Sequence, residues 1–408
     1  MRRVVITGMG VHSSLGHDWV SMKEALVKTE NTVQTVEEWS KYEGLNARLA
    51  APCDFTTPSH YSRKQTRGMG RVSLMAVSAS EMALKQAGLL DDPEFLQSGK
   101  IGVAYGSSSG SPPAMMDFGR FLVDESTSGI TATTYIRMMS HTAAVNVGLF
   151  FKLQGRLIPT SSACTSGSQA IGFAYESIRS GAIDAMIAGG AEELCPTQVA
   201  IFDTLFATST RNSEPHLTPR PYDVDRDGLV IGEGASSLIL EEYEHAKARG
   251  ATILAEIVGF GTNLDGCHVT QPQTSTMAQV MKLSLEQAGM TASDIGYCSA
   301  DGTATQHGDI AESKAVESVL GSNVPMSSLK SYIGHTLGAC GAIEAFACVN
   351  MLHDGWVHPT VNLQNVDPNC GDLDYVREQG GRSVPLNAVM SNNFAFGGIN
   401  TSLILCRA

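Results

Sequence analysis

A cysteine at position 164 lies where a strand-like stretch passes into a helix-like stretch. Residues 159–170 read PTSSACTSGSQA, with the apolar pair 157–158 before them and a helix-like segment, 170–178, after them. A strand that breaks into a helix at small residues forms a sharp turn, and the start of a helix carries positive potential. Such a turn favours the thiolate of Cys164, which is the nucleophilic form. A buried structural cysteine fits the local composition equally well, since the chain has nine cysteines.

Four further segments combine glycines with polar side chains that could act in catalysis. They are residues 220–235 (RPYDVDRDGLVIGEGA), 301–309 (DGTATQHGD), 328–339 (SLKSYIGHTLGA) and 391–400 (SNNFAFGGIN). When each residue is taken alone, an ordinary structural interpretation is available: a loop histidine for His335, a surface lysine for Lys330, and core aromatics for Phe394 and Phe396. Only the presence of the whole set in one chain indicates a site.

Length, charge and cysteine spacing limit the classes of function. A chain of 408 residues is too long for one ordinary core, so two structural halves are expected. The 28 basic and 41 acidic residues give a net charge of −13, which argues against a general nucleic-acid binder. The cysteines are scattered without a CxxC pair or paired Cys/His spacing, so neither a metal site nor a disulfide framework is indicated.

The sequence also lacks membrane and export signals. The apolar run after Arg3 stops after three residues, which is too short for a signal peptide. No apolar stretch reaches the roughly 18 residues that a membrane-spanning helix needs. A cytoplasmic protein without a membrane span is therefore expected.

The elements that must position these segments alternate between apolar strands and helices. Strand-like apolar runs occur at residues 101–105, 185–190, 236–240 and 401–405. Helical periodicity occurs at residues 73–86, 142–153, 277–288 and 342–352. This alternation predicts mostly parallel sheets that are covered by helices.

A β-rich run that ends in Gly-x-Gly occurs twice, at 3–10 and again at 255–261. Two copies of one α/β unit are therefore plausible, with the joint near Arg249, which predicts halves at 1–249 and 250–408. The first Gly-x-Gly is followed by Ser13, where a dinucleotide fingerprint has its third glycine, so nicotinamide dinucleotide binding is not expected.

In their order and spacing, the five motifs resemble those of the β-ketoacyl-acyl-carrier-protein synthases, over a stretch that runs from Val4 to Leu405. The likeness is greatest to the short-tunnel fatty-acid elongation type and its aryl-polyene and polyketide relatives. It implies a thiolase-like α/β fold, a five-layer αβαβα sandwich built from two similar halves. It also implies a dimer whose sheet edges pair across the two-fold axis, either a homodimer or a heterodimer with a paralogous ketosynthase or chain-length factor.

The resemblance further implies a two-step acyltransferase that binds no cofactor and no metal. Cys164 would accept an acyl group from the 4'-phosphopantetheine of an acyl carrier protein, and the acyl group would then condense with malonyl-carrier protein as CO₂ leaves. The backbone N–H groups of Cys164 and Phe396 would hold the thioester oxygen, with Phe394 beside them in the gate loop. His335 would hold the enolate oxygen. The resemblance also implies that Lys330 orders the site through hydrogen bonds to Glu312. Thr303 and Thr305 would bind the phosphopantetheine arm.

Asp301 departs from the family pattern, which has histidine there. A neutral imidazole donates a hydrogen bond to an enolate, whereas an ionised carboxylate only accepts and repels it. Three interpretations stay open: Asp301 is protonated and donates, the chain is a condensation-impaired subunit resembling a chain-length factor, or the residue is an introduced substitution in a normal synthase. His307, six residues further on, is a weaker candidate to replace the missing histidine.

Two other departures concern the acyl chain and the gate. Ala395 stands where the family usually has glycine, and its Cβ restricts the backbone of the gate loop. Ser108 and Ser109 align with the stretch that controls the far end of the acyl tunnel, and their small size predicts room for a longer chain.

A basic cluster, made of Arg63, Lys64 and Arg67 with Arg71 nearby, contrasts with the negative charge of the whole chain. It is either a solvated helix face or the docking site for an acidic carrier protein, as the family resemblance implies. A thiolase that uses coenzyme A is a weaker alternative, because the motif around Lys330 and His335 and this basic cluster count against it.

Overall fold

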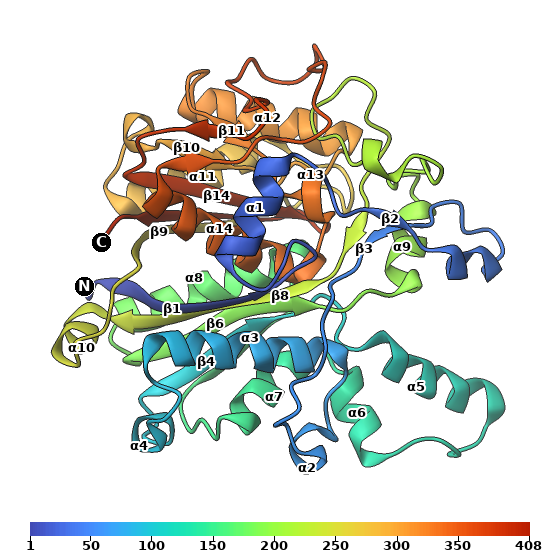
Figure 1. Ribbon diagram of the computed structural model, residues 1–408, viewed down its shortest axis with the longest axis vertical. Helices are drawn as coiled ribbons and strands as arrows, with labels where there is room; N and C mark the ends of the chain where they lie inside the picture. Colours follow the sequence, from blue (N-terminus) through green and yellow to red (C-terminus); the bar gives the residue numbers. More distant parts are fainter.

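Two five-stranded sheets join edge to edge into one ten-stranded sheet (Figure 1). A computed structural model describes all residues from 1 to 408. The N-terminal half contributes β1 (Val4–His12), β4 (Ile101–Gly106), β5 (Leu157–Thr160), β6 (Ala185–Glu192) and β8 (Gly234–Glu242). The C-terminal half contributes β9 (Ala255–Leu264), β10 (Tyr297–Ser299), β11 (Met326–Ser327), β14 (Ala388–Ala395) and β15 (Ile399–Cys406). The strand order is β11-β10-β14-β15-β9-β1-β8-β6-β4-β5, and an antiparallel β1–β9 pairing joins the halves.

The two halves repeat one topology. In each half the first strand lies at the joint, and the fifth, fourth, second and third strands follow it outward. The pairing directions also match, with two antiparallel ladders next to the joint and two parallel ladders beyond them. The expectation of mostly parallel sheets is therefore wrong, because the last strand of each half returns antiparallel between its neighbours.

Helices complete five layers. In each half, one helix follows the first strand and covers the outer face, and another follows the third strand and packs into the middle (Figure 1). The outer helices are α3 (Arg71–Ala87) and α7 (Thr142–Phe150) on one face, and α11 (Thr274–Ala288) and α12 (Gln306–Leu320) on the other. The central pair is α8 (Ser166–Arg179) and α14 (Cys340–Asp354). This arrangement confirms the αβαβα sandwich.

Close packing of the middle layer depends on small residues. A Cβ at Gly190 of β6 would lie 2.3 Å from the carbonyl oxygen of Gly338, and one at Gly167 of α8 would lie 2.9 Å from the same oxygen. Backbones that approach this closely exclude any side chain larger than hydrogen. The segment before α14 is thereby held against the N-terminal half.

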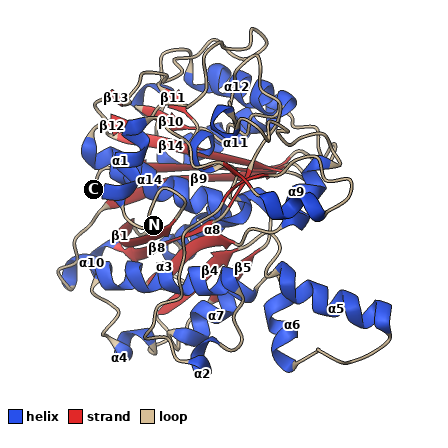
Figure 2. Ribbon diagram, turned by 45° about the vertical axis from the view of Figure 1, so that its right-hand side comes forward, coloured by secondary structure: helices blue, strands red, loops and turns tan.

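The remaining helices and short strands lie outside these five layers. They are α1 (Trp19–Lys28), α2 (Arg63–Thr66), α4 (Pro93–Leu96), α5 (Pro112–Asp124), α6 (Ala132–Met138), α9 (Pro196–Asp203), α10 (Tyr243–Ala248), α13 (Lys330–Ile333), and the short strands β2 (Gln34–Thr35), β3 (Leu49–Ala51), β7 (Ile231–Gly232), β12 (Trp356–Val357) and β13 (Arg382–Ser383). Helices α5 and α6 project from the body of the molecule (Figure 2). No helix is both long enough and apolar enough to cross a membrane.

The polar segments singled out in the sequence follow the carboxyl ends of parallel strands. Cys164 comes after β5, Asp301 after β10, Lys330 after β11 and Phe396 after β14. Because the halves are related by the repeated topology, these ends face one another across the middle layer. Crevices at the carboxyl ends of parallel strands are where α/β folds bind their ligands.

Candidate active site

Cys164 occupies a strained turn between β5 and α8. Ala163, just before it, has a φ of 51°, in the left-handed region that costs a residue with a Cβ roughly 1–2 kcal/mol. Two hydrogen bonds of the Ser166 hydroxyl hold the turn, one accepted from the Ser162 N–H at 3.0 Å and one donated to the Ala163 carbonyl at 2.7 Å. The sharp turn predicted from the sequence is confirmed, and α8 begins at Ser166, earlier than the periodicity indicated.

The sulfur of Cys164 is buried and protonated in the resting protein. Burial raises the pKa of the thiol to about 12, and the negative charge of Asp301 raises it further, while Lys330 and the backbone N–H of Phe396 oppose the shift. The prediction of a ready thiolate is therefore wrong for this state, because loss of solvation outweighs the nearby positive groups. A reacting molecule must accept or displace the thiol proton as it enters.

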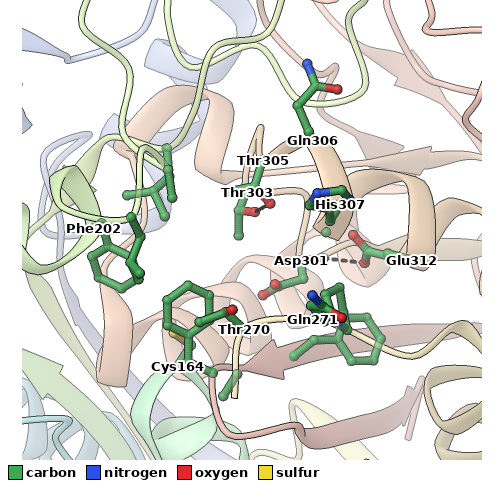
Figure 3. Close-up of a pocket in the computed structure, with 18 of the residues that line it drawn as sticks. Cys164, Phe202, Thr270, Gln271, Asp301, Thr303, Thr305, Gln306, His307 and Glu312 are labelled. Atoms are coloured by element: carbon green, nitrogen blue, oxygen red, sulfur yellow. Dashed lines mark hydrogen bonds between the residues drawn. The ribbon is translucent and has the colours of Figure 1, made fainter. Parts of the chain in front are cut away.

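A cavity of about 470 Å³ opens onto Cys164 (Figure 3). Its wall includes most of the residues expected from the sequence: Cys164, Asp301, Thr303, Thr305, Glu312, His335, Phe394 and Phe396. On the apolar side, the rings of Phe202 and Phe396 pack with centroids 5.1 Å apart. The hydroxyls of Thr303 and Thr305 lie 3.0 Å from each other on the polar side. The cavity therefore combines a buried nucleophile with both apolar and hydrogen-bonding walls.

Lys330 is a buried cation between two carboxyl groups. Its Nζ donates to Asp301 Oδ1 at 2.9 Å and to Glu344 Oε1 at 2.6 Å. Asn393 Nδ2 joins the same two groups, at 2.6 Å from Glu344 Oε2 and 3.4 Å from Asp301 Oδ1. Burial disfavours the ammonium, but the acidic groups, Asp301 first among them, raise the pKa of Lys330 well above its usual value. For Glu344, burial raises the pKa to about 7 although Lys330 opposes the shift.

The expected pairing of Lys330 with Glu312 is wrong. Glu312 instead accepts hydrogen bonds from the backbone N–H groups of Asp301 at 2.7 Å and Gly302 at 2.8 Å, and from the Tyr222 hydroxyl at 2.7 Å. It shapes the loop that carries Asp301. Sequence reasoning missed Glu344, although one signal for it exists: it is a lone acidic residue in the otherwise apolar start of α14.

His335 presents a neutral ring to the cavity. Its backbone is fixed by a 2.7 Å hydrogen bond to the Val230 carbonyl and by the Gly232 N–H at 2.9 Å. Burial and the charge of Lys330 hold the pKa of His335 well below its usual value. Nδ1 is buried without a partner, and an unpaired lone pair is tolerated better than an unpaired N–H, so we assign the proton to Nε2. His335 is thus a hydrogen-bond donor toward the cavity.

Asp301 presents an acceptor at the same place. Its Oδ1 carries both hydrogen bonds described above, whereas Oδ2 makes none within the protein and stays open to the cavity. Figure 3 shows the carboxylate directed into the cavity. His307 lies near the mouth, beside Gln306 and Thr305, in the first turn of α12 (Figure 3).

The loop that is expected to act as a gate is tied to the segment 265–269. The Gly397 N–H donates to the Val269 carbonyl, and the Asp265 N–H donates to the Gly398 carbonyl, each at 2.8 Å. Gly397 and Gly398 carry the positive φ values of 90° and 75° that the turn requires. Ala395 lies within β14, opposite Ile399, in ordinary extended backbone. Its Cβ therefore imposes no strain in this state.

The stretch expected at the far end of the acyl tunnel is tied to a buried carboxyl group. Glu192 accepts hydrogen bonds from the Ser108 N–H at 2.8 Å, the Ser109 hydroxyl at 3.2 Å and the Gly338 N–H at 2.9 Å. Neither serine is part of the cavity wall. In this state the stretch is a hydrogen-bonded loop rather than an open end.

The basic cluster divides into two parts. Arg63, Lys64 and Arg67 are exposed and form no ion pair. Arg71 instead binds the buried Glu233, with Nε 2.7 Å from Oε1, and donates to two backbone carbonyls. Only the first three side chains are free to meet a partner.

Comparison with known proteins finds relatives that match the chain over its whole length. The family model described as "Beta-ketoacyl synthase, N-terminal domain" matches residues 1–246, and its C-terminal counterpart matches residues 254–364. The chain is 38% identical to 3-oxoacyl-[acyl-carrier-protein] synthase 2 of Vibrio cholerae over 413 residues, covering 100% of this chain and 99% of the relative. A crystal structure of a β-ketoacyl synthase from Burkholderia phymatum is 57% identical with a TM-score of 0.98, and covers both chains fully. The ishigamide ketosynthase/chain length factor is 30% identical with a TM-score of 0.90, covering 100% of this chain and 99% of that one.

Proposed function

The chain belongs to the β-ketoacyl synthase family, and from this premise we propose that it loads an acyl group onto Cys164 but condenses it slowly with malonyl-carrier protein. The observation that carries the proposal is the position of Asp301, whose open carboxylate oxygen shares the cavity with the nucleophile. Loading and condensation use different parts of this cavity, so one residue can affect them unequally.

Loading depends on groups that are intact in this chain. The arm of the carrier protein would enter past Thr303 and Thr305, and its thioester carbon would meet the sulfur of Cys164. The backbone N–H of Phe396 faces that sulfur and, with the N–H of Cys164, would stabilise the oxyanion of the tetrahedral intermediate. His335 Nε2 and the leaving phosphopantetheine thiolate are the available partners for proton exchange with the thiol. Asp301 takes no part in this step, although its charge makes the thiolate harder to form.

Condensation depends on donors at the enolate oxygen, and here Asp301 is unfavourable. The Lys330 ammonium and the Asn393 amide both donate to Oδ1, so the contacts of Asp301 in this structure are those of an acceptor. His335 remains as the single side-chain donor. Loss of one donor to a developing oxyanion costs on the order of 10²- to 10³-fold in rate, and a carboxylate in its place adds repulsion.

A second candidate function is that of a partner subunit for an active ketosynthase. Asp301 favours it, as does the likeness to the ishigamide ketosynthase/chain length factor. The intact Cys164 favours an enzyme instead. In either case we expect a dimer, with a second copy or a paralogue, because β5 is an edge strand and α5 exposes Leu122 and Val123.

Docking of the carrier protein is assigned to Arg63, Lys64 and Arg67. These side chains are exposed and unpaired on a chain of net charge −13, so they form a local site for an acidic partner. The phosphopantetheine arm then brings the acyl group to the cavity.

Two half-reactions test the proposal. The protein and its Asp301→His variant are incubated with octanoyl-carrier protein, and the adduct on Cys164 is located by peptide mass spectrometry. Release of CO₂ from malonyl-carrier protein is then followed in both proteins. We expect an acyl adduct on Cys164 in both proteins, no adduct in Cys164→Ala, and condensation at least about 10²-fold faster in Asp301→His. Equal condensation in the two proteins would show that Asp301 donates a proton, and would refute the impairment.

A further inference from the structure

The open oxygen of Asp301 is a base with no assigned task. Oδ1 is held by Lys330 at 2.9 Å and Asn393 at 3.4 Å, which fixes the plane of the carboxylate. Oδ2 has no hydrogen-bond partner in the chain, and Asp301 lines the cavity. An oriented, unpaired acceptor that faces the cavity beside Cys164 is suited to binding a second substrate and accepting its proton.

We propose that acyl-Cys164 transfers its acyl group to a primary amine, with Asp301 Oδ2 binding the ammonium and removing its proton. The inference rests on the loading of Cys164 proposed above and concerns the step that follows it. The product is a carboxamide in place of a β-ketoacyl thioester.

The charges around the cavity favour a cation as the second substrate. Lys330 is a single ammonium between two acidic groups, Asp301 and Glu344. Lys330 does not line the cavity, and the one arginine that does, Arg226, is already paired with Asp309 at 3.4 Å and Asp367 at 2.7 Å. An ammonium would therefore meet an unpaired carboxylate oxygen, whereas a malonyl carboxylate would meet like charge.

An amine also suits the chemistry of a thioester better than a hydroxyl group does. A neutral amine attacks a thioester without prior ionisation, and a carboxylate then accepts the proton from the positively charged nitrogen of the tetrahedral intermediate. The same carboxylate is too weak a base to ionise an alcohol. The oxyanion that forms at the acyl carbon would still be held by the N–H groups of Cys164 and Phe396.

The transfer balances without an oxidant or a reductant. The ammonium loses one proton through Asp301 Oδ2 to water, and the neutral nitrogen attacks the acyl carbon of the thioester. A C–N bond forms and the C–S bond to Cys164 breaks. The second nitrogen proton passes by way of Asp301 to the leaving sulfur, which regenerates the thiol.

Space for the amine exists once the carrier protein has left. The cavity of about 470 Å³ must admit a phosphopantetheine arm during loading, and the part that the arm vacates is open to an amine while the acyl group stays on Cys164. Cys164 and Asp301 both line it, so an amine that enters through the mouth reaches both groups.

The test separates loading from discharge. Cys164 is loaded with octanoyl-carrier protein, the carrier is removed, and the acyl-enzyme is mixed with hexylamine, hexanol or buffer alone. Intact-mass spectrometry follows loss of the octanoyl group, and liquid chromatography with mass spectrometry measures N-hexyl octanamide. The same series is run on Asp301→Asn, which keeps the shape but removes the base, and on Asp227→Asn as a matched control on the cavity wall.

We expect amide formation by the unaltered protein that falls about 100-fold in Asp301→Asn, which has no base at this position, and is unchanged in Asp227→Asn. Normal loading with amide formation insensitive to Asp301→Asn would overturn the inference and leave the proposed function standing. Asp301-dependent transfer to hexanol or water in preference to hexylamine would overturn the assignment of an amine. Failure of Cys164 to load would overturn both proposals. If Asp301→Asn does not fold, Asp301→Ala, which also removes the base, takes its place.

Discussion

Replacing Lys330 by methionine should destabilise the protein strongly and in a pH-dependent way. The ammonium lies 2.9 Å from Asp301 and 2.6 Å from Glu344, and its side chain is 2% exposed. At an effective dielectric constant of about 20, each pair is worth about 6 kcal/mol before the cost of removing the charges from water. Removal of one partner from a buried pair leaves an uncompensated charge and typically costs about 3–5 kcal/mol. We expect a loss of that size in the free energy of unfolding at pH 8.

The loss should shrink as the pH falls. Burial already raises the pKa of Glu344 to about 7, above its usual unfolded value, and loss of Lys330 removes the main opposing influence, so the pKa rises further. A group whose pKa is higher in the folded state stabilises the fold when it is protonated, and this contribution disappears as the pH rises through the folded pKa. The variant should therefore recover part of its stability at pH 6.

Urea unfolding monitored by circular dichroism at pH 8 and pH 6 measures both effects. Lys23→Met is the matched control, because Lys23 lies 2.6 Å from Asp354 but is 36% exposed, and such pairs are worth about 1 kcal/mol or less. A loss for Lys330→Met no larger than that of the control at both pH values would refute the reasoning, since it would mean that the two acidic groups are not charged in the fold.

Three further outcomes are expected. Alkylation of Cys164 by iodoacetamide should accelerate about tenfold for each pH unit up to pH 10 without a plateau, because the thiolate fraction grows in this way below a pKa of about 12; a plateau near pH 8 would contradict the burial argument. Ala163→Gly should raise the free energy of unfolding by about 1 kcal/mol, because it relieves the positive φ at the turn, and an unchanged urea midpoint would count against strain there. Reversal of the charges of Arg63, Lys64 and Arg67 should raise the Kd for carrier protein and flatten its salt dependence, as measured by surface plasmon resonance, while loading from a small N-acetylcysteamine thioester stays unchanged.

Local patterns in the sequence were sufficient for most of the fold. Apolar runs such as 101–105 and 185–190 became the buried strands β4 and β6 because a strand covered on both faces is apolar throughout. The repeated Gly-x-Gly runs marked the first strand of each half. The direction of strand pairing was not predictable in this way. Whether the last strand of each half runs parallel or antiparallel to its neighbours depends on contacts between residues that are far apart in the sequence.

For the site residues too, some properties follow from the sequence and others only from the tertiary structure. Cys164, as the candidate nucleophile, and Asp301, as the departure from the family pattern, could be singled out from the chain alone, because each lies in a short motif of characteristic residue types. The partner of Lys330 could not, because Glu344 and Asp301 reach it from separate segments that only the packing of α14 against β14 brings together. The resting state of the Cys164 thiol was likewise decided by the tertiary structure. The pKa of the thiol depends on how completely the surrounding elements exclude water and on which charges they place nearby. Neither property can be predicted from the residues next to the cysteine in the sequence.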